Sequence, residues 1–242
     1  ARERGAEFRM STPVQTILSR NGRACGVALA SGAREEFDAV VINADFGHAA
    51  TNLFEPGVIR KYTPAAMQRK RFSCSTFMLY LGVDKLYQEP HHNILFAKSY
   101  KENITDIARG EKLSDDASVY VRNASATDPT LAPPGHSALY VLVPVPNNRS
   151  CISWDKGIVE AFREQILNRI CEKTSMKDLR EHIVAEKIIT PAQWERDYSV
   201  YEGATFNLGH NISQMLYFRP HNRFEELGNC YLVGGEIGRA HV

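Results

Sequence analysis

Three residues that follow a short apolar run, Asn43-Ala44-Asp45, could bring polar groups and exposed backbone close to a ligand. The run before them, Val40-Val41-Ile42, is short and β-branched, which is typical of a buried strand. Residues 46–54 then have a helical pattern. Ligands in open α/β sheets bind at the carboxyl ends of strands. The stretch is therefore either a ligand-binding turn or an ordinary buried strand with a polar exit, and the strand alone does not decide between them.

A second polar pair, Arg219 and His221, lies in the run Phe218-Arg219-Pro220-His221-Asn222-Arg223. Pro220 favours an extended backbone at the residue before it. The Arg219 guanidinium could contact a ligand or form a structural ion pair with a carboxylate, and both interpretations stay open. No residue of the chain is predicted to be a general base, so the catalytic residues are unassigned.

The residues that commonly bind metals are poorly placed for that role. His91 and His92 are adjacent in a predicted strand, so their side chains point to opposite faces and do not share a metal. The five cysteines are scattered and contain no Cys-x-x-Cys pair. We therefore predict free thiols in a reducing compartment, with no disulfide framework and no metal site.

Length and composition restrict the class of protein. The chain has 242 residues, of which 43% are hydrophobic and 24% charged, so it can form a sizeable core. A net charge of +1 gives no electrostatic reason to expect nucleic acid. No apolar run approaches the ~20 residues of a transmembrane helix, and no signal peptide is recognisable. The chain opens in the middle of an element, which we interpret as a fragment.

Three short strands are predicted to lead into the polar turn at Asn43. Residues 13–18, 25–29 and 36–41 are β-rich, and Asn21-Gly22 between the first two is a strong hairpin signal. A second turn surrounds Gly32. These signals predict a three-stranded meander that delivers the chain into the strand at residues 40–42.

The middle of the chain mixes strands and helices, which predicts an α+β domain. In the strand at 73–84, Phe77 and Leu79 share one face while Tyr80 lies on the other. Both faces are apolar, so this strand is either buried on both sides or lines a cavity. Thr63 and Thr190 each precede a proline and are predicted helix N-caps. Further strands are predicted at 91–96, 118–123, 138–144 and 184–189, and helices at 100–109, 155–174 and 176–182.

Several stretches resemble bacterial-type phytoene desaturases, which belong to the FAD-dependent amine-oxidase-like superfamily. The meander resembles the late part of the FAD domain in that superfamily, and the resemblance covers residues 4–235. The other stretches that carry it are Ser75-Thr76-Phe77-Met78-Leu79-Tyr80-Leu81-Gly82, residues 128–135, Val143-Pro144-Val145-Pro146, residues 218–223, and Asn229-Cys230-Tyr231-Leu232-Val233-Gly234-Gly235.

The resemblance implies a partial FAD-binding Rossmann-like α/β domain with an inserted α+β substrate domain. It implies that residues 1–49 and 216–235 belong to the FAD domain, that 50–215 bind substrate, and that 236–242 are a non-native tail. The residues expected near FAD are Val14, Asn43, Ala44, Asp45, Gly234 and Gly235. The chain contains no Gly-x-Gly-x-x-Gly turn, so by itself it is expected to be inactive and to hold FAD weakly.

The implied activity is FAD-dependent desaturation of phytoene or a related apolar polyene in carotenoid biosynthesis. The alternatives are a carotenoid isomerase, another flavin oxidase, or a non-catalytic isoprenoid-binding domain. The residues expected to contact substrate are Phe77, Leu79, Tyr80, Phe96, Tyr140, Phe206, Arg219 and His221. For the apolar ones, packing in the core is the alternative. We expect a cytoplasmic protein that binds the membrane surface peripherally, with Arg69, Lys70 and Arg71 near that surface. Nucleic acid is not an expected partner, and the oligomeric state stays open.

Overall fold

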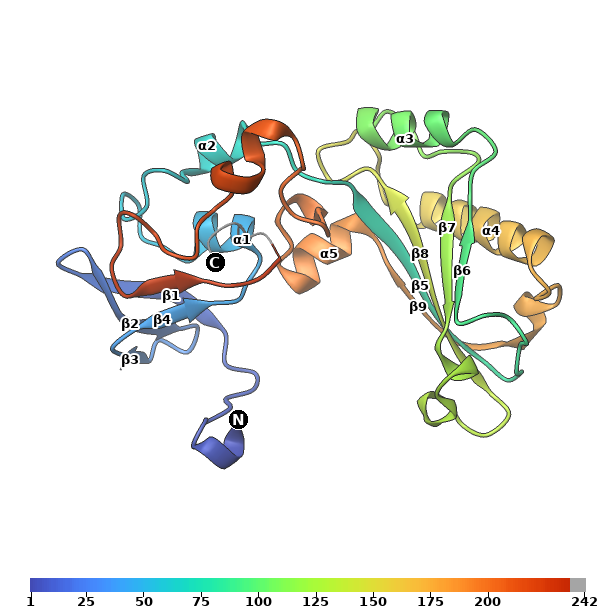
Figure 1. The fold of residues 1–242 in the computed structure, drawn as a ribbon, viewed down its shortest axis with the longest axis horizontal. Coiled ribbons are helices and arrows are strands. Elements are labelled where there is room, and N and C mark those ends of the chain that lie inside the picture. Colours follow the sequence, from blue (N-terminus) through green and yellow to red (C-terminus); the bar gives the residue numbers. More distant parts are fainter. Residues whose placement is uncertain (236–242) are drawn as a thin grey trace. The chain divides into compact units, whose positions relative to one another are not determined.

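The computed structural model describes residues 1–235, which form two compact units (Figure 1). The first unit contains Ala1–Arg71 and the chain from Asn207 onward, and the second unit contains Phe72–Phe206. The second unit is continuous in sequence and interrupts the first. The divisions therefore fall at 71/72 and 206/207, whereas we expected 49/50 and 215/216. The expected tail at 236–242 lies outside the described residues.

The first unit contains the predicted meander, in which β1 (Val14–Arg20), β2 (Arg23–Leu29) and β3 (Arg34–Glu36) pair antiparallel. A separate parallel pair joins β4 (Val40–Ile42) to β10 (Cys230–Leu232). The strand that returns late in the sequence thus pairs with the strand that precedes Asn43. This pairing brings two segments from opposite ends of the described chain together.

Two short helices also belong to the first unit, and they explain why its boundary lies beyond residue 49. Helix α1 (Phe46–Asn52) buries Phe46, and the carbonyl oxygen of Leu53 accepts a hydrogen bond from the Ile17 amide at 2.8 Å. Helix α2 (Pro64–Gln68) begins at the predicted N-cap, where the Thr63 hydroxyl accepts a hydrogen bond from the Ala66 amide.

The second unit is built on a five-stranded antiparallel sheet in the order β6-β7-β8-β5-β9. Its strands are β5 (Ser75–Val83), β6 (His92–Leu95), β7 (Val119–Asn123), β8 (Ser137–Val145) and β9 (Ile183–Ile189). Its helices are α3 (Tyr100–Arg109), α4 (Lys156–Lys173) and α5 (Pro191–Tyr198). The elements interleave as expected for an α+β fold.

Helix α4 covers one face of the sheet and forms the core of the second unit (Figure 1). It begins at Asp155, whose carboxylate accepts a hydrogen bond from the Ile158 amide. Phe162, Ile166 and Ile170 then recur along one side of the helix and are buried. Because alternate residues of a strand point to opposite faces, every second side chain of β5, β7 and β8 packs into this core.

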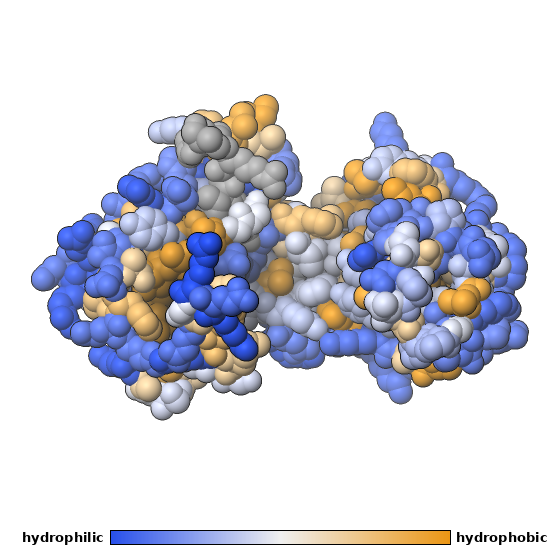
Figure 2. All heavy atoms as spheres, turned by 60° about the horizontal axis from the view of Figure 1, so that its bottom comes forward, coloured by the Kyte–Doolittle hydropathy of each residue, from blue (hydrophilic) through white to orange (hydrophobic). Residues whose placement is uncertain are grey.

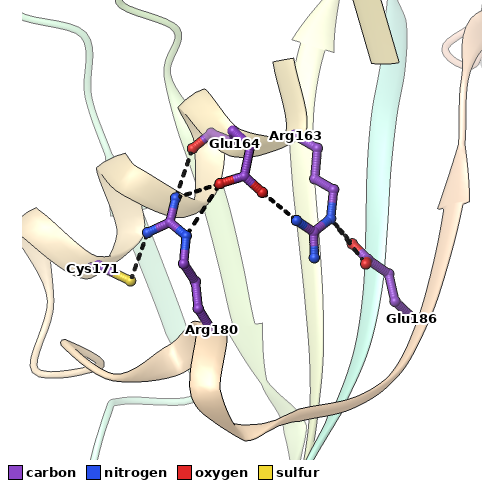
Figure 3. A network of polar contacts seen from close by, with 5 residues as sticks. All are labelled: Arg163, Glu164, Cys171, Arg180 and Glu186. Atoms are coloured by element: carbon purple, nitrogen blue, oxygen red, sulfur yellow. Dashed lines mark hydrogen bonds and ion pairs between the residues drawn. The ribbon is translucent and has the colours of Figure 1, made fainter. Parts of the chain in front are cut away.

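Charged side chains tie α4 to the edge of the sheet (Figure 3). On α4, Arg163 donates to Glu186 of β9 at 2.7 Å and also pairs with its neighbour Glu164. Arg180, which precedes β9, donates to the Glu164 carboxylate at 3.0 Å and to its backbone carbonyl at 3.1 Å. The network links α4 to the edge strand β9, while the buried apolar side of α4 determines which face of the sheet the helix covers.

The predicted helix at 176–182 is wrong, because the structure has only a 3-10 turn at Leu179–His182. Met176 and Leu179 are both fully buried against the core. The Met176 amide donates to the Thr174 hydroxyl, which ends α4 in a turn. With so few residues available, helix nucleation costs more than the following hydrogen bonds return, so tertiary packing decides the local structure.

Candidate functional site

The carboxyl ends of β4 and β10 lie side by side, because the two strands are parallel and in register through Ile42 and Leu232. The Val233 amide extends the pairing with a 2.9 Å hydrogen bond to the Ile42 carbonyl. The predicted residues Asn43 and Ala44 follow one strand, and Gly234 and Gly235 follow the other; all four are exposed. The structure therefore brings these two predicted groups together at one end of a parallel pair.

Asp45 has a structural role that the sequence analysis did not assign. Its carboxylate accepts a hydrogen bond from the His48 amide at 2.8 Å and caps α1. The signal was present in the sequence, because aspartate directly before a helical run is a common N-cap. Gly234 has a φ of 128°, a conformation that L side chains rarely adopt, so a glycine suits this position.

Val14 lines a hollow of about 400 Å³ between the meander and β4. Apolar side chains gather on the face of the first unit seen in Figure 2. The apolar residues that line the hollow are Val14, Val27, Leu29, Phe37, Ala39, Val40 and Val41. The charged residues of its wall are paired, since Arg9 forms ion pairs with Glu7 and Glu35. Val14 and Asn43 to Asp45 lie in the same unit, as predicted.

The second unit has an aromatic surface on the sheet face opposite α4. Tyr80 of β5 and Tyr140 of β8 are register partners, with ring centroids 5.4 Å apart. Tyr120 of β7 lies next to Tyr140 at 6.2 Å. We call these three residues the tyrosine face. The structure thus unites the predicted residues Tyr80 and Tyr140 and adds Tyr120, which the sequence analysis missed although it alternates with core positions in its strand.

The tyrosine face is flanked by positive charge. Arg122 pairs in register with Tyr140, and Lys187 pairs with Tyr80. Burial raises the pKa of Tyr80 and of Tyr140, so both rings stay neutral at physiological pH. The other register partners that share this face contain no aspartate or glutamate; they are Thr76, Met78, Gly82, His92, Ile94, Ala138, Leu142, Pro144, Ala185 and Ile189.

A hydrogen-bonded histidine fixes the orientation of Arg122. The Arg122 Nε donates to His91 Nε2 at 2.8 Å, so this imidazole nitrogen must be an acceptor. His91 Nδ1 in turn contacts the hydroxyl of Thr127 at 2.5 Å. Partial burial, with His92 and Arg122 nearby, lowers the pKa of His91. His91 is therefore a neutral positioning group for the arginine.

The remaining predicted substrate residues of the second unit lie elsewhere. Phe77 and Leu79 are fully buried in the core under α4, which favours the core-packing alternative for both. The Phe77 ring stacks on Trp154 at 5.6 Å and meets Phe162 edge-on at 5.1 Å. Phe96 is 64% exposed beyond the end of β6, and Phe206 is 48% exposed at the end of the unit.

Arg219 and His221 belong to the first unit, in the segment before β10. The Arg219 Nη1 donates to the carbonyl oxygens of Leu208 and Gln214 at 3.3 and 3.4 Å. His221 Nε2 lies 3.1 Å from the carbonyl oxygen of Tyr217. Both side chains therefore hold the backbone of this segment in place.

Neither cysteines nor metals add a further site to the described part of the chain. All five cysteines are free thiols. Among residues 1–235, no three His, Cys, Asp or Glu side chains are grouped closely enough to hold a metal ion. No helix within this same range has the length and apolar character needed to cross a membrane.

Known proteins resemble this chain over nearly its whole length. It is 54% identical to a 4,4'-diapophytoene desaturase (4,4'-diapolycopene-forming) of Methylomonas sp over 96% of the chain and 45% of that protein. It is 42% identical to an all-trans-zeta-carotene desaturase of Myxococcus xanthus over 97% of the chain and 45% of that protein. These similarities confirm the resemblance to carotenoid desaturases, and the chain spans about half the length of these relatives.

A solved oxidoreductase from Methanosarcina mazei has a similar fold, with a TM-score of 0.51 at 17% identity over 100% of this chain and 49% of that one. The family model for flavin containing amine oxidoreductases matches residues 1–241. This chain belongs to the flavin-containing amine oxidoreductase family.

Proposed function

We propose that this chain is part of an FAD-dependent desaturase that removes hydrogen from phytoene, diapophytoene or a related apolar polyene in carotenoid biosynthesis. The observation that carries the proposal is the 54% identity to a diapophytoene desaturase, which extends over 96% of the chain and both structural units. The chain corresponds to 45% of that relative, so the activity is proposed for the whole protein.

Membership of the family implies a flavin cofactor, and we propose that the flavin is FAD. Two features of the first unit fit a dinucleotide: exposed backbone at the carboxyl ends of β4 and β10, and the apolar hollow beside Val14. Asn43, Ala44, Gly234 and Gly235 would hold the cofactor through their backbone, while Asp45 fixes the turn by capping α1. Bound FAD would supply the two-electron oxidation.

We propose that the second unit binds the polyene on its tyrosine face. A hydrocarbon offers no polar handle, so only apolar and aromatic contact can hold it in a water-excluded place. Tyr80, Tyr120 and Tyr140 supply this contact on a face that has no carboxylate at its register positions. In the first unit, Arg219 and His221 hold the segment before β10, the strand that leads to the proposed cofactor turn.

The charges around the tyrosine face favour a neutral substrate over an amine. A cationic amine is attracted by the faces of aromatic rings and is repelled by positive charge nearby. Here Arg122 and Lys187 flank the rings and would repel a cation. We therefore place the polyene ahead of an amine among substrates of this family.

We further propose a cytoplasmic enzyme that binds the membrane peripherally. The free cysteines fit a reducing compartment. A long polyene dissolves in the bilayer core, so an enzyme that takes it up must work at the membrane surface.

The proposal is tested with the full-length protein. Purified protein should contain FAD and should convert phytoene or diapophytoene, supplied in detergent micelles, into a product with a longer conjugated system. Tyr140→Asp places a charge on the tyrosine face and should lower turnover. Ile158→Asp is the matched control, because this exposed residue lies in the first turn of α4, where an acidic side chain is favourable.

Flavin-loaded protein that leaves both polyenes unchanged would refute the desaturase assignment. Equal loss of turnover in the two aspartate variants would refute the assignment of the tyrosine face.

A further inference from the structure

Arg122 of the second unit has a supported orientation but no acidic partner in the part of the chain that the structure describes. It lies on β7 between the buried residues Val121 and Asn123, and its own side chain is exposed. Its Nε donates to His91 Nε2 at 2.8 Å. Among residues 1–235, its two terminal nitrogens, Nη1 and Nη2, have no hydrogen-bond or ion-pair partner. The N–H groups of both terminal nitrogens are therefore available to a ligand.

A chain of hydrogen bonds supports the arginine from behind. Because His91 Nε2 accepts from Arg122, the neutral imidazole carries its proton on Nδ1, which lies 2.5 Å from the Thr127 hydroxyl. That hydroxyl donates to the carbonyl oxygen of Ala124 at 3.2 Å, so the chain ends on the backbone. Holding a long side chain in one orientation costs side-chain entropy, and a ligand that binds it then loses less.

The sheet face around Arg122 is aromatic and apolar. Strands β6, β7 and β8 lie side by side (Figure 1), and the register places Arg122 between His92 and Tyr140. The next row of the same face contains three register partners, none of them fully buried: Ile94, Tyr120 and Leu142. Neighbouring rows on one face are ~7 Å apart along the strands, which an arginine side chain can span. A guanidinium thus lies at the side of a surface suited to an apolar chain.

The positive charge of Arg122 is not neutralised on this face. The register positions of the face contain no aspartate or glutamate. The other cation, Lys187, is already engaged, since its Nζ donates to the Tyr198 hydroxyl at 3.0 Å and lies 5.7 Å from the centre of that ring. A hydrocarbon makes no use of a free guanidinium, so the charge indicates a ligand with an anionic group.

We propose that the tyrosine face binds polyenes that carry a carboxylate at one end, and that Arg122 holds this carboxylate through its two terminal nitrogens. The planar guanidinium presents paired N–H groups that match the two carboxylate oxygens. The polyene chain lies over Tyr120, Tyr140 and Leu142. The inference rests on the proposed function, and it adds acid-ended polyenes to the hydrocarbons as a second class of ligand for the same site.

A carboxylate fits this face better than a more highly charged group such as a diphosphate. One guanidinium balances one negative charge, and Lys187 is held by Tyr198. Two other sources of a carboxylate are tested below: an acidic side chain from the remainder of the same polypeptide, and one from a second copy of this chain.

The test uses full-length protein with all-trans-retinoic acid and its methyl ester, two polyenes that differ in the charge of one end. Both are added in non-ionic micelles at mildly alkaline pH, where the acid is ionised, and binding is followed by quenching of tryptophan fluorescence. For each protein the ratio of the two dissociation constants is measured, which cancels the partition of each probe into micelles. Arg122→Gln should reduce the preference for the acid roughly tenfold relative to wild type.

Two further variants test the geometry. Arg122→Lys keeps the charge but lacks the planar pair of donors, so its preference for the acid should fall between wild type and Arg122→Gln. His91→Phe keeps the arginine but removes the nitrogen that orients it, and it should also lose part of the preference. The matched control is Arg109→Gln, which removes the same charge from an exposed position at the end of α3 and should bind both probes in the wild-type ratio.

Four results would overturn the proposal. An unchanged ratio in Arg122→Gln would exclude Arg122 as the anion site, and an equal fall in Arg109→Gln would show that only the overall charge matters. A lower thermal midpoint of ligand-free Arg122→Gln would assign the guanidinium to a carboxylate elsewhere in the same polypeptide. A lower oligomeric state of that variant would assign it to a second copy.

The binding measurement needs no turnover, which separates this inference from the proposed function. A wild-type protein that prefers the acid through Arg122 but desaturates neither phytoene nor diapophytoene would contradict only the proposed function. A protein that desaturates them but has the same ratio as its Arg122→Gln variant would contradict only this inference.

Discussion

Phe77 and Tyr80 of β5 should respond to substitution in opposite ways, because they lie on opposite faces of the sheet. Phe77 is fully buried and packs against Trp154 and Phe162, at centroid distances of 5.6 and 5.1 Å. Tyr80 is partly exposed on the other face and contacts Tyr140. We therefore predict that Phe77 matters for stability and that Tyr80 matters for substrate binding.

The size of the stability difference follows from burial. Removing a fully buried phenylalanine ring costs ~3–5 kcal/mol, since it loses the transfer free energy and leaves a cavity. With a urea m-value of ~2 kcal/mol/M, Phe77→Ala should lower the unfolding midpoint of the second unit by roughly 2 M. Tyr80→Ala loses a ring pair worth ~0.5–1.5 kcal/mol and a partly exposed side chain, so its midpoint should fall by less than half as much.

The assay is a urea titration followed by intrinsic fluorescence, to which Trp154 contributes through its contact with Phe77. Turnover is then measured on folded protein, with Phe77→Leu as the conservative core variant. Tyr80→Ala should lower turnover, and Phe77→Leu should leave it near the wild-type value. A midpoint that falls more for Tyr80→Ala than for Phe77→Ala would refute the assignment of the two faces.

Three further predictions concern a helix cap, an ion pair and the segment before β10. Thr190→Ala breaks the capping box with Gln193 and should destabilise the second unit by ~0.5–2 kcal/mol in the same urea titration, while Thr190→Ser should not. Equal unfolding midpoints for the alanine and serine variants would contradict this. The pKa of Asp178 is lowered to about 2, mainly by its hydrogen bond from Lys85, so its stabilisation is present at neutral pH and is lost as the pH falls through about 2. Asp178→Asn should therefore lower the thermal midpoint at neutral pH, with the difference from wild type vanishing in strong acid; a constant difference would refute the linkage. Arg219→Ala and Arg219→Lys should both reduce desaturase turnover, because neither side chain reproduces the guanidinium that donates to two backbone carbonyls. Normal turnover in both variants would show that Arg219 has no role in function.

Local signals in the sequence predicted local structure well. The predicted caps at Thr63 and Thr190 each begin a helix in the structure, and the helix predicted at 155–174 is α4. The Asn21-Gly22 turn joins β1 to β2, as its backbone preference requires. In each case the residues that determine the conformation lie within a few positions of it, so their spacing is enough.

Features set by distant residues were not predictable in the same way. The alternation of β5 showed that Phe77 and Tyr80 point apart, but only the position of α4 shows which of them is in the core. The first unit extends to Arg71 because Gln214, far away in sequence, bonds its backbone. Asp45 is a different case, because its capping of α1 is local and its signal was in the sequence, but the sequence analysis assigned the residue to the cofactor instead.

The central claim is that this chain belongs to a flavin enzyme that oxidises a polyene. The most direct measurement is a single turnover of full-length, flavin-loaded protein without oxygen or any other electron acceptor, mixed with phytoene or diapophytoene in micelles. We predict that the absorbance of the oxidised flavin bleaches while a product with one additional carbon–carbon double bond and a longer conjugated system appears in equal amount. A flavin that stays oxidised with both polyenes but is reduced by an amine would contradict the claim.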